Sequence, residues 1–205
     1  MQSVIRATSQ HFLLPFLGLF KLHAAEGSGT NLDRSLANLN RALELDAGNT
    51  QAYYVRGRVC YVMQRWEDGL RDFRHFCEKA PGEASYPRFF IWLMRARKGE
   101  QVAADQELGA WFGPGKKPKA NHWEKNIGTF LLGGMGEADF LGAASRGHDS
   151  GRQCEGWFYA GMKCLLSGDA AAARDYFQKC LATERKDFDE YNFAAAELRL
   201  LERQR

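Results

Sequence analysis

Two distant segments of the chain carry the same residue types at the same spacing, and this repetition constrains the fold most. The first segment runs from Thr50 to Pro81 and has glycine at its eighth position and phenylalanine at its twenty-fourth. The second begins at Cys154 and places Gly161 and Phe177 at the same two positions. Two weaker units lie between, and starts near residues 50, 85, 122 and 154 give a period of roughly 34 residues. A small residue facing a large aromatic one at this spacing predicts a hairpin of two closely crossing helices.

The first unit also has an aromatic residue at its fourth position, Trp66 at its seventeenth and Gly69 at its twentieth. Pro81 follows as a helix terminator, because proline lacks an amide donor and clashes with the preceding turn. This pattern resembles the tetratricopeptide repeat (TPR). The resemblance implies helix hairpins that stack side by side and bind other proteins.

We therefore predict an all-α fold, a TPR-like α-solenoid of antiparallel helix hairpins with a C-terminal capping helix. A cap is expected because the last hydrophobic face of a solenoid has no neighbour. In the tail, Phe188, Tyr191, Ala194, Leu198 and Leu201 recur at helical spacing and are expected to point inward. The expected organisation is a signal peptide or first helix at 1–25, a partial repeat at 26–49, a TPR at 50–82, a degenerate TPR at 83–114, a short degenerate hairpin at 119–147, a TPR at 154–184 and the capping helix at 187–205.

The first 25 residues differ in composition from the rest. They contain two bases and no acid, and the apolar run Phe12–Phe20 is followed by small residues at Ala24 and Ala25. A basic start, a short apolar stretch and a small-residue end are typical of a secretory signal peptide. This interpretation predicts an exported protein, periplasmic or secreted. If the same residues form a structural first helix instead, the protein is expected in the cytoplasm.

Two further elements carry a more specific resemblance. One is Cys154-Glu155-Gly156-Trp157-Phe158-Tyr159-Ala160-Gly161, and the other is Asp187-Phe188-Asp189-Glu190-Tyr191. Together with the order of the units around them, they resemble bacterial TPR proteins of the new-lipoprotein-I group. The resemblance implies an exported adaptor that docks other envelope proteins, such as proteases or cell-wall enzymes. No cysteine stands at residues 22–27, where a lipid anchor would be attached, which favours a soluble form.

No motif predicts catalysis, a metal or a cofactor. His148-Asp149-Ser150 contains the residue types of a hydrolase triad, but sequence neighbours cannot adopt triad geometry, so a loop is expected. Gly133–Gly136 lacks the strand that precedes a phosphate-binding loop and is expected to be a helix–helix turn. The net charge of +3 argues against a nucleic-acid partner. The basic loop Gly115–Lys119 is either solvated or a contact for an anionic surface.

The five cysteines are expected to be mostly packing residues. Cys60, Cys77, Cys164 and Cys180 occupy core positions of their units, where an unpaired cysteine acts as a small hydrophobe. Cys154 stands at the first position of its unit and is expected to be the most exposed.

We predict a non-catalytic scaffold or adaptor of the bacterial cell envelope whose partners are other proteins or peptides, with no small-molecule substrate. In TPR arrays the first helix of each hairpin lines the concave groove, and aromatic residues and arginine favour interfaces. The alternative is a structural module that homodimerises through its terminal helices. The groove residues implied by the resemblance are Tyr54, Arg58, Tyr61, Tyr86, Phe89, Leu93, Trp123, Asn126, Phe158 and Met162.

Overall fold

The structure is a computed structural model that describes residues 28–112 and 120–203, and all regular elements within these ranges are helical. The predicted signal peptide at 1–25 and the basic loop at 115–119 lie outside the described residues. The helices are α2 (Ser28–Leu45), α3 (Thr50–Val62), α4 (Trp66–Lys79), α5 (Ser85–Arg97), α6 (Gln101–Phe112), α7 (His122–Leu131), α8 (Glu137–Ser145), α9 (Ser150–Leu166), α10 (Ala170–Ala182) and α11 (Asp189–Arg203), with short 3₁₀ turns at Pro81–Glu83 and Arg146–His148.

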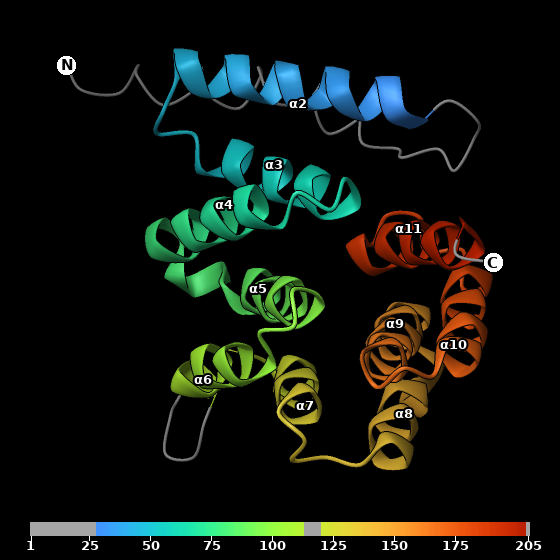
Figure 1. The fold of residues 1–205 in the computed structure, drawn as a ribbon. Coiled ribbons are helices and arrows are strands. Elements are labelled where there is room, and N and C mark those ends of the chain that lie inside the picture. Colours follow the sequence, from blue (N-terminus) through green and yellow to red (C-terminus); the bar gives the residue numbers. More distant parts are fainter. Residues whose placement is uncertain (1–27, 113–119, 204–205) are drawn as a thin grey trace.

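The helices pair along the chain as four hairpins, α3–α4, α5–α6, α7–α8 and α9–α10, with α2 packed before the first (Figure 1). The predicted all-α, TPR-like solenoid is confirmed. The stack curves so strongly that its two ends meet: α11 packs against α9 and α10 and also contacts α3. The described part of the chain is therefore a curved array whose inner side is covered by its own last helix (Figure 1).

Each well-formed hairpin is held at its crossing point by a glycine against a phenylalanine ring. A methyl group at Gly57 would lie 2.9 Å from the Phe73 ring, and one at Gly161 would lie 2.7 Å from the Phe177 ring. Both phenylalanine side chains are completely buried. The two positions that defined the sequence repeat are thus the positions at which the two helices of a hairpin touch.

Two hydrophobic cores follow from this arrangement. The larger is continuous from α3 to α11 and is rich in aromatic rings, among them Phe90, Phe158 and Phe193. The smaller lies between α2 and α3, where Leu36, Leu39 and Leu43 pack against residues of the next helix. The leucine spacing at i, i+3 and i+7 explains why this stretch forms a helix with one buried face.

Helix α9 begins at Ser150, four residues before the start of the repeat pattern at Cys154. Asp149 caps it, because its side chain accepts hydrogen bonds from the amides of Gly151 and Arg152 at 2.9 Å and 3.2 Å. Within His148-Asp149-Ser150, the first residue ends the 3₁₀ turn, the second is the N-cap and only the third lies in α9. The turn between α7 and α8 contains Gly133 with a φ of +77°, a conformation that glycine adopts without strain.

The structure corrects two expectations about the cysteines. Cys154 was expected to be exposed, but its side chain is completely buried, because the extra N-terminal turn of α9 places it inside the helix bundle. Cys164 was expected in the core, yet it is half-buried and its sulfur lies 3.9 Å from a carboxylate oxygen of Glu137. Cys60, Cys77 and Cys180 are buried, as predicted.

Replacing the crossing glycine of the last hairpin tests this packing. We expect Gly161→Ala to lower the free energy of unfolding by about 1–3 kcal/mol, because the added methyl group overlaps the Phe177 ring. Gly109→Ala in α6 is the matched control: its methyl group meets nothing within 4 Å, so higher helix propensity should leave stability unchanged or raise it by up to about 1 kcal/mol. Urea denaturation measures both values, and equal effects of the two substitutions would contradict the crossing model.

Candidate functional site

The concave face of the array is the candidate site, and helix α11 lies in it. Six residues of α11 recur at helical spacing and form one buried face. Two of the six are acids, which is unusual for a buried stripe. The face consists of Glu190, Phe193, Ala194, Glu197, Leu198 and Leu201.

Phe193 is the central contact of this face. Its ring stacks on Tyr61 of α3 with a centroid distance of 4.0 Å. It also meets the edge of Phe90 of α5 at 5.1 Å and lies 6.1 Å from Phe158 of α9. The side chain of Phe193 thus contacts three of the four hairpins, α3–α4, α5–α6 and α9–α10.

Polar contacts fix α11 at its start and at its middle. At its start, the Tyr54 hydroxyl donates a 2.7 Å hydrogen bond to Asp189, which also forms an ion pair with Arg58. At its middle, the Tyr61 hydroxyl donates a 3.0 Å hydrogen bond to Glu197. Burial raises the pKa of both carboxyls, while the neighbouring arginine and phenol act in the opposite direction. The groove is therefore built to hold an acidic helix.

Arg97 completes the contact at Glu197. Its guanidinium lies 3.2 Å from the carboxylate, whose side chain is 1% exposed. A buried carboxylate without such a partner is strongly destabilising, so the ion pair and the hydrogen bond fix the register of α11 in the groove.

The predicted groove residues divide into two groups. Tyr54, Arg58, Tyr86 and Asn126 are half-buried, whereas the other six are buried. Five residues surround α11 or its immediate neighbours, namely Tyr54, Arg58, Tyr61, Phe158 and Met162. Tyr86 and Trp123 instead approach Glu155, and Phe89 stacks on Phe112 at 5.4 Å. Leu93 lies within the large core, and Asn126 lies on α7.

A second polar cluster lies deeper on the same side, around Glu155 of α9. The carboxylate accepts hydrogen bonds from the Trp123 indole and the Tyr86 phenol. Glu190 of α11 is its acidic neighbour and accepts a 3.0 Å hydrogen bond from Tyr159. Burial raises the pKa of Glu155 to about 7, and Asp149 and Glu124 act in the same direction. Burial also raises the pKa of Glu190 well above its ordinary value, and the neighbouring Glu155 adds to this effect.

Two converging carboxylates with raised pKa values are also a common arrangement for acid–base catalysis. Here, however, the side chains of Glu155 and Glu190 are only 4% and 3% exposed, and aromatic donors of the chain occupy their oxygens. A catalytic acid must reach the atom it protonates. The cluster therefore supports packing of α11 rather than catalysis. Among the described residues, no group of three or more His, Cys, Asp or Glu side chains is placed to hold a metal ion.

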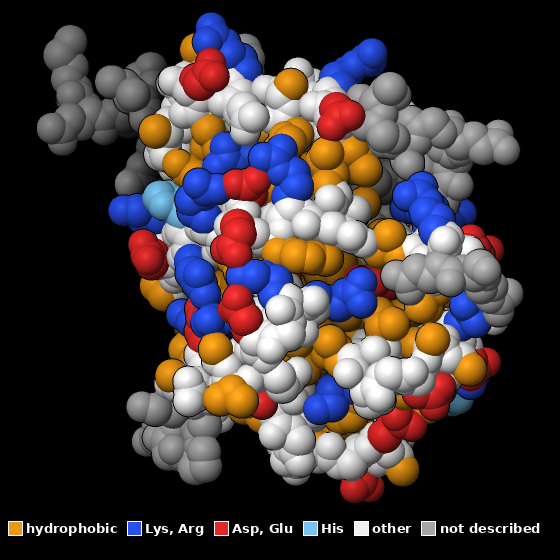
Figure 2. All heavy atoms as spheres, in the orientation of Figure 1, with side chains coloured by type: hydrophobic (Ala, Val, Ile, Leu, Met, Phe, Trp, Pro, Cys, Tyr) orange, Lys and Arg blue, Asp and Glu red, His pale blue; other side chains and the backbone are white. Residues whose placement is uncertain are grey.

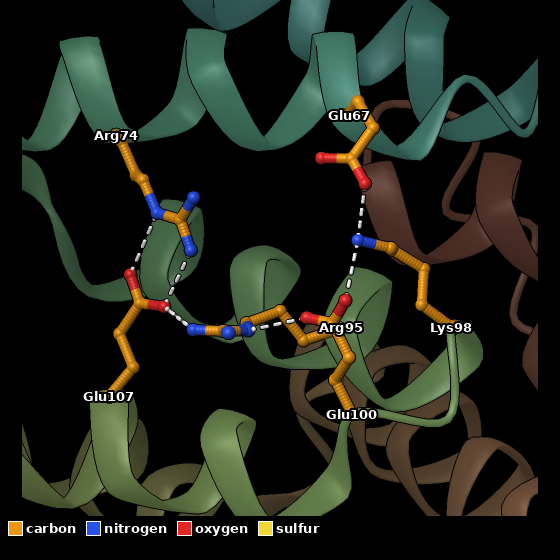
Figure 3. Close-up of polar contacts among 6 residues, drawn as sticks. All are labelled: Glu67, Arg74, Arg95, Lys98, Glu100 and Glu107. Carbon is orange, nitrogen blue, oxygen red and sulfur yellow. Dashed lines mark hydrogen bonds and ion pairs between the residues drawn. The ribbon is translucent and has the colours of Figure 1, made fainter.

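The outer face has a different character. On the side shown in Figure 2, acidic and basic side chains alternate over α4, α5 and α6. In Figure 3, Arg74 and Arg95 both bind Glu107, at 2.8 Å and 2.7 Å, and Lys98 lies between Glu67 and Glu100. These charges neutralise one another across three helices. The network therefore leaves no strong surplus charge to attract a partner.

No family model matches the chain. A curated protein of Haemophilus influenzae, described as "Lipoprotein NlpI homolog", is 25% identical over 188 residues. The alignment covers 89% of this chain and 57% of that protein, so the chain spans a little over half the length of this relative.

The chain is distantly similar to an NlpI-like lipoprotein. An identity of 25% supports a general likeness to NlpI-like proteins of the TPR type and nothing more specific. It agrees with the helical repeats and suggests a protein-interaction role in general. In the described parts of the chain, no helix has both the length and the apolar character needed to cross a bilayer.

Sequence reasoning missed the acids that hold α11. Asp189 and Glu190 were quoted as part of a motif, and Glu155 as part of another, but none was assigned a role. A signal was available: Glu190 and Glu197 stand at i and i+7 on the apolar face of the tail helix. Acids at such positions indicate that the facing surface supplies donors.

Stability should depend on pH through Glu155. In the unfolded chain the pKa is near 4.5, and in the folded protein it is about 7. Between these values the folded state binds more protons, so the contribution of Glu155 to stability falls as pH rises through this window. The variant Glu155→Gln keeps an acceptor for Trp123 but cannot ionise. As the pH rises from 5 to 8, we expect its free energy of unfolding to increase by about 2 kcal/mol relative to that of the unmodified protein.

The measurement is thermal unfolding of both proteins across this pH range. Other titratable groups from several elements also face Glu155, namely Tyr86, Glu124, Asp149 and Glu190. Because the others remain in the variant, only the difference between the two curves reports Glu155. Glu202→Gln, the same substitution at an exposed site of α11, is the control. A flat difference for Glu155→Gln would refute the assignment.

Proposed function

We propose that this protein is a non-catalytic protein-binding scaffold or adaptor of the bacterial cell envelope that docks partner proteins or peptides on its concave face. The fold and the distant similarity to an NlpI-like lipoprotein support a protein-interaction role and a place in the envelope. Docking on the concave face is our own step beyond them.

The observation that carries the proposal is the way in which the concave face holds α11. Aromatic rings around Phe193 supply the apolar contact, and Arg58 and Arg97 meet acids four residues before and four residues after Phe193. Amphipathic helices commonly bind grooves through such regularly spaced anchors. A surface with this chemistry suits a helical partner segment that has an aromatic residue with an acid about one turn before it and another about one turn after it.

Three of the buried groove residues, Tyr61, Phe158 and Met162, lie around α11, so a partner reaches them only when α11 moves. We therefore propose that a partner helix takes the place of α11. In that case α11 acts as an internal competitor, and the partner's affinity is reduced by the fraction of molecules in which the groove is closed.

The alternative, self-assembly through the terminal helices, receives less support from the described residues. The outward face of α2 carries charged side chains such as Asp33, Arg34 and Arg41. Stable homodimer interfaces are usually depleted in charge at their centre.

Site-specific photo-crosslinking in the native cells tests the proposal. A benzoylphenylalanine replaces Tyr54, which borders α11 on the concave side, or Tyr176, which is half-buried on the outer helix α10. We expect light-dependent adducts with another protein from position 54 and not from position 176.

The mass of the adduct separates the outcomes. A new protein attached at position 54 supports docking in the groove, and an adduct of twice the chain mass supports self-assembly instead. Adducts obtained only from position 176, or equally from both positions, would show that partners do not use the concave face.

A further inference from the structure

A pair of cysteines lies at the base of the α9–α10 hairpin. The sulfur of Cys154 on α9 is 3.4 Å from that of Cys180 on α10, and both side chains are completely buried. The two residues are 26 positions apart in the sequence. A disulfide bond is about 2.05 Å long, so small rotations of the two side chains would bring the sulfurs to bonding distance.

We propose that Cys154 and Cys180 are an oxidation site, at which a disulfide-bearing oxidant joins α9 to α10 covalently. The remaining cysteines have other surroundings. Cys60 lies in the small core next to α2, Cys77 lies on α4, and the sulfur of Cys164 faces Glu137. The hairpin pair is therefore the place at which two thiols already lie within 3.4 Å of each other.

The two thiols differ in a way that orders the reaction. A hydrogen bond from Cys180 lowers the pKa of Cys154, with help from Thr183 and Arg185, although burial acts in the opposite direction. Burial and the neighbouring Cys154 sulfur raise the pKa of Cys180. The thiolate is the reactive form, so Cys154 is the attacking residue and Cys180 the resolving one.

The proposed reaction is a thiol–disulfide exchange in two steps. The Cys154 thiolate attacks one sulfur of the oxidant, which breaks the oxidant's S–S bond, forms a mixed disulfide and releases one thiol. Cys180 then loses its proton to solvent and attacks the Cys154 sulfur, which expels the second thiol. The two protein thiols are oxidised to one disulfide, and the oxidant disulfide is reduced to two thiols.

Access to the pair requires opening of the segment between α10 and α11. Arg185 in this segment forms an ion pair with Asp187 at 2.9 Å and a 3.3 Å contact with the Ser150 hydroxyl on α9. Thr183 donates a 2.6 Å hydrogen bond to the carbonyl of Cys180. Contacts of this kind near the surface are weak individually, and short segments held by them open readily.

The bond would also affect the helix that fills the groove. The Cys180 sulfur lies 3.8 Å from the backbone carbonyl of Glu190, in the first turn of α11. A bond between Cys180 and Cys154 would therefore restrain the end of α10 against which the first turn of α11 packs. This inference does not depend on what binds the concave face.

Thiol mapping of the full chain tests the proposal. The reduced protein is equilibrated with glutathione disulfide in excess over glutathione, quenched with acid, unfolded and alkylated, and its peptides are analysed by mass spectrometry. We expect alkylation of three of the five cysteines and a linked peptide pair that contains Cys154 and Cys180. The melting temperature should rise by roughly 5 °C or more, because the bond limits the unfolded chain.

Three variants act as controls. Cys154→Ser and Cys180→Ser should each abolish the linked peptide, whereas Cys164→Ser, at the half-buried cysteine, should leave it unchanged. If either of the first two variants does not fold, the peptide map of the unmodified chain decides. Five alkylated cysteines at equilibrium, or a bond involving any other cysteine, would overturn the proposal.

Discussion

The stacking of Phe193 on Tyr61 determines the shape of the molecule, since it brings the last helix against the first full hairpin. In a repeat array each unit normally contacts only its neighbours, and the concave side stays open. Here α11 crosses that side and contacts both α3 and α9. The array therefore gains contacts between residues that are more than a hundred positions apart, such as Tyr61 and Glu197.

The same packing places charge where a solenoid would usually be apolar. Asp189 and Glu197 are held by Arg58 and Arg97, so α11 cannot slide along the groove without leaving a buried acid unpartnered. Buried ion pairs add little net stability to the fold, but they determine which helix the groove accepts and in which register that helix binds. A groove of this kind recognises a helix by its acids and its central aromatic ring, which gives the docking proposal its chemical content.

Much of the fold could be predicted because helix crossings require particular residues. Gly57 against Phe73 and Gly161 against Phe177 repeat in sequence since the same hairpin geometry recurs. The position of α11 could not be predicted from a repeat pattern, because it depends on how far the array curves. The tail was expected to cap the last hairpin with an apolar face, and Ala194, Leu198 and Leu201 are indeed buried.

The repeat pattern assigns the predicted groove residues to the first helix of each hairpin but does not establish that they are accessible. Phe89 and Phe158 occupy concave positions, yet neighbouring rings bury both completely. Similarly, the exposure expected for Cys154 depended on where α9 begins, and helix boundaries are weakly encoded in sequence. The acids of α11 were missed since a charged residue on a helix usually faces water.

Hydrogen exchange of α11 tests most directly whether this helix is part of the folded core. Seated between α3 and α9, the backbone amides from Phe193 to Leu201 should exchange far more slowly than those of a solvent-exposed helix, while opening of α11 alone lets them exchange before those of α9. Slow exchange in α9 together with exchange within seconds in α11 would show that the groove is open and that the helix does not occupy it.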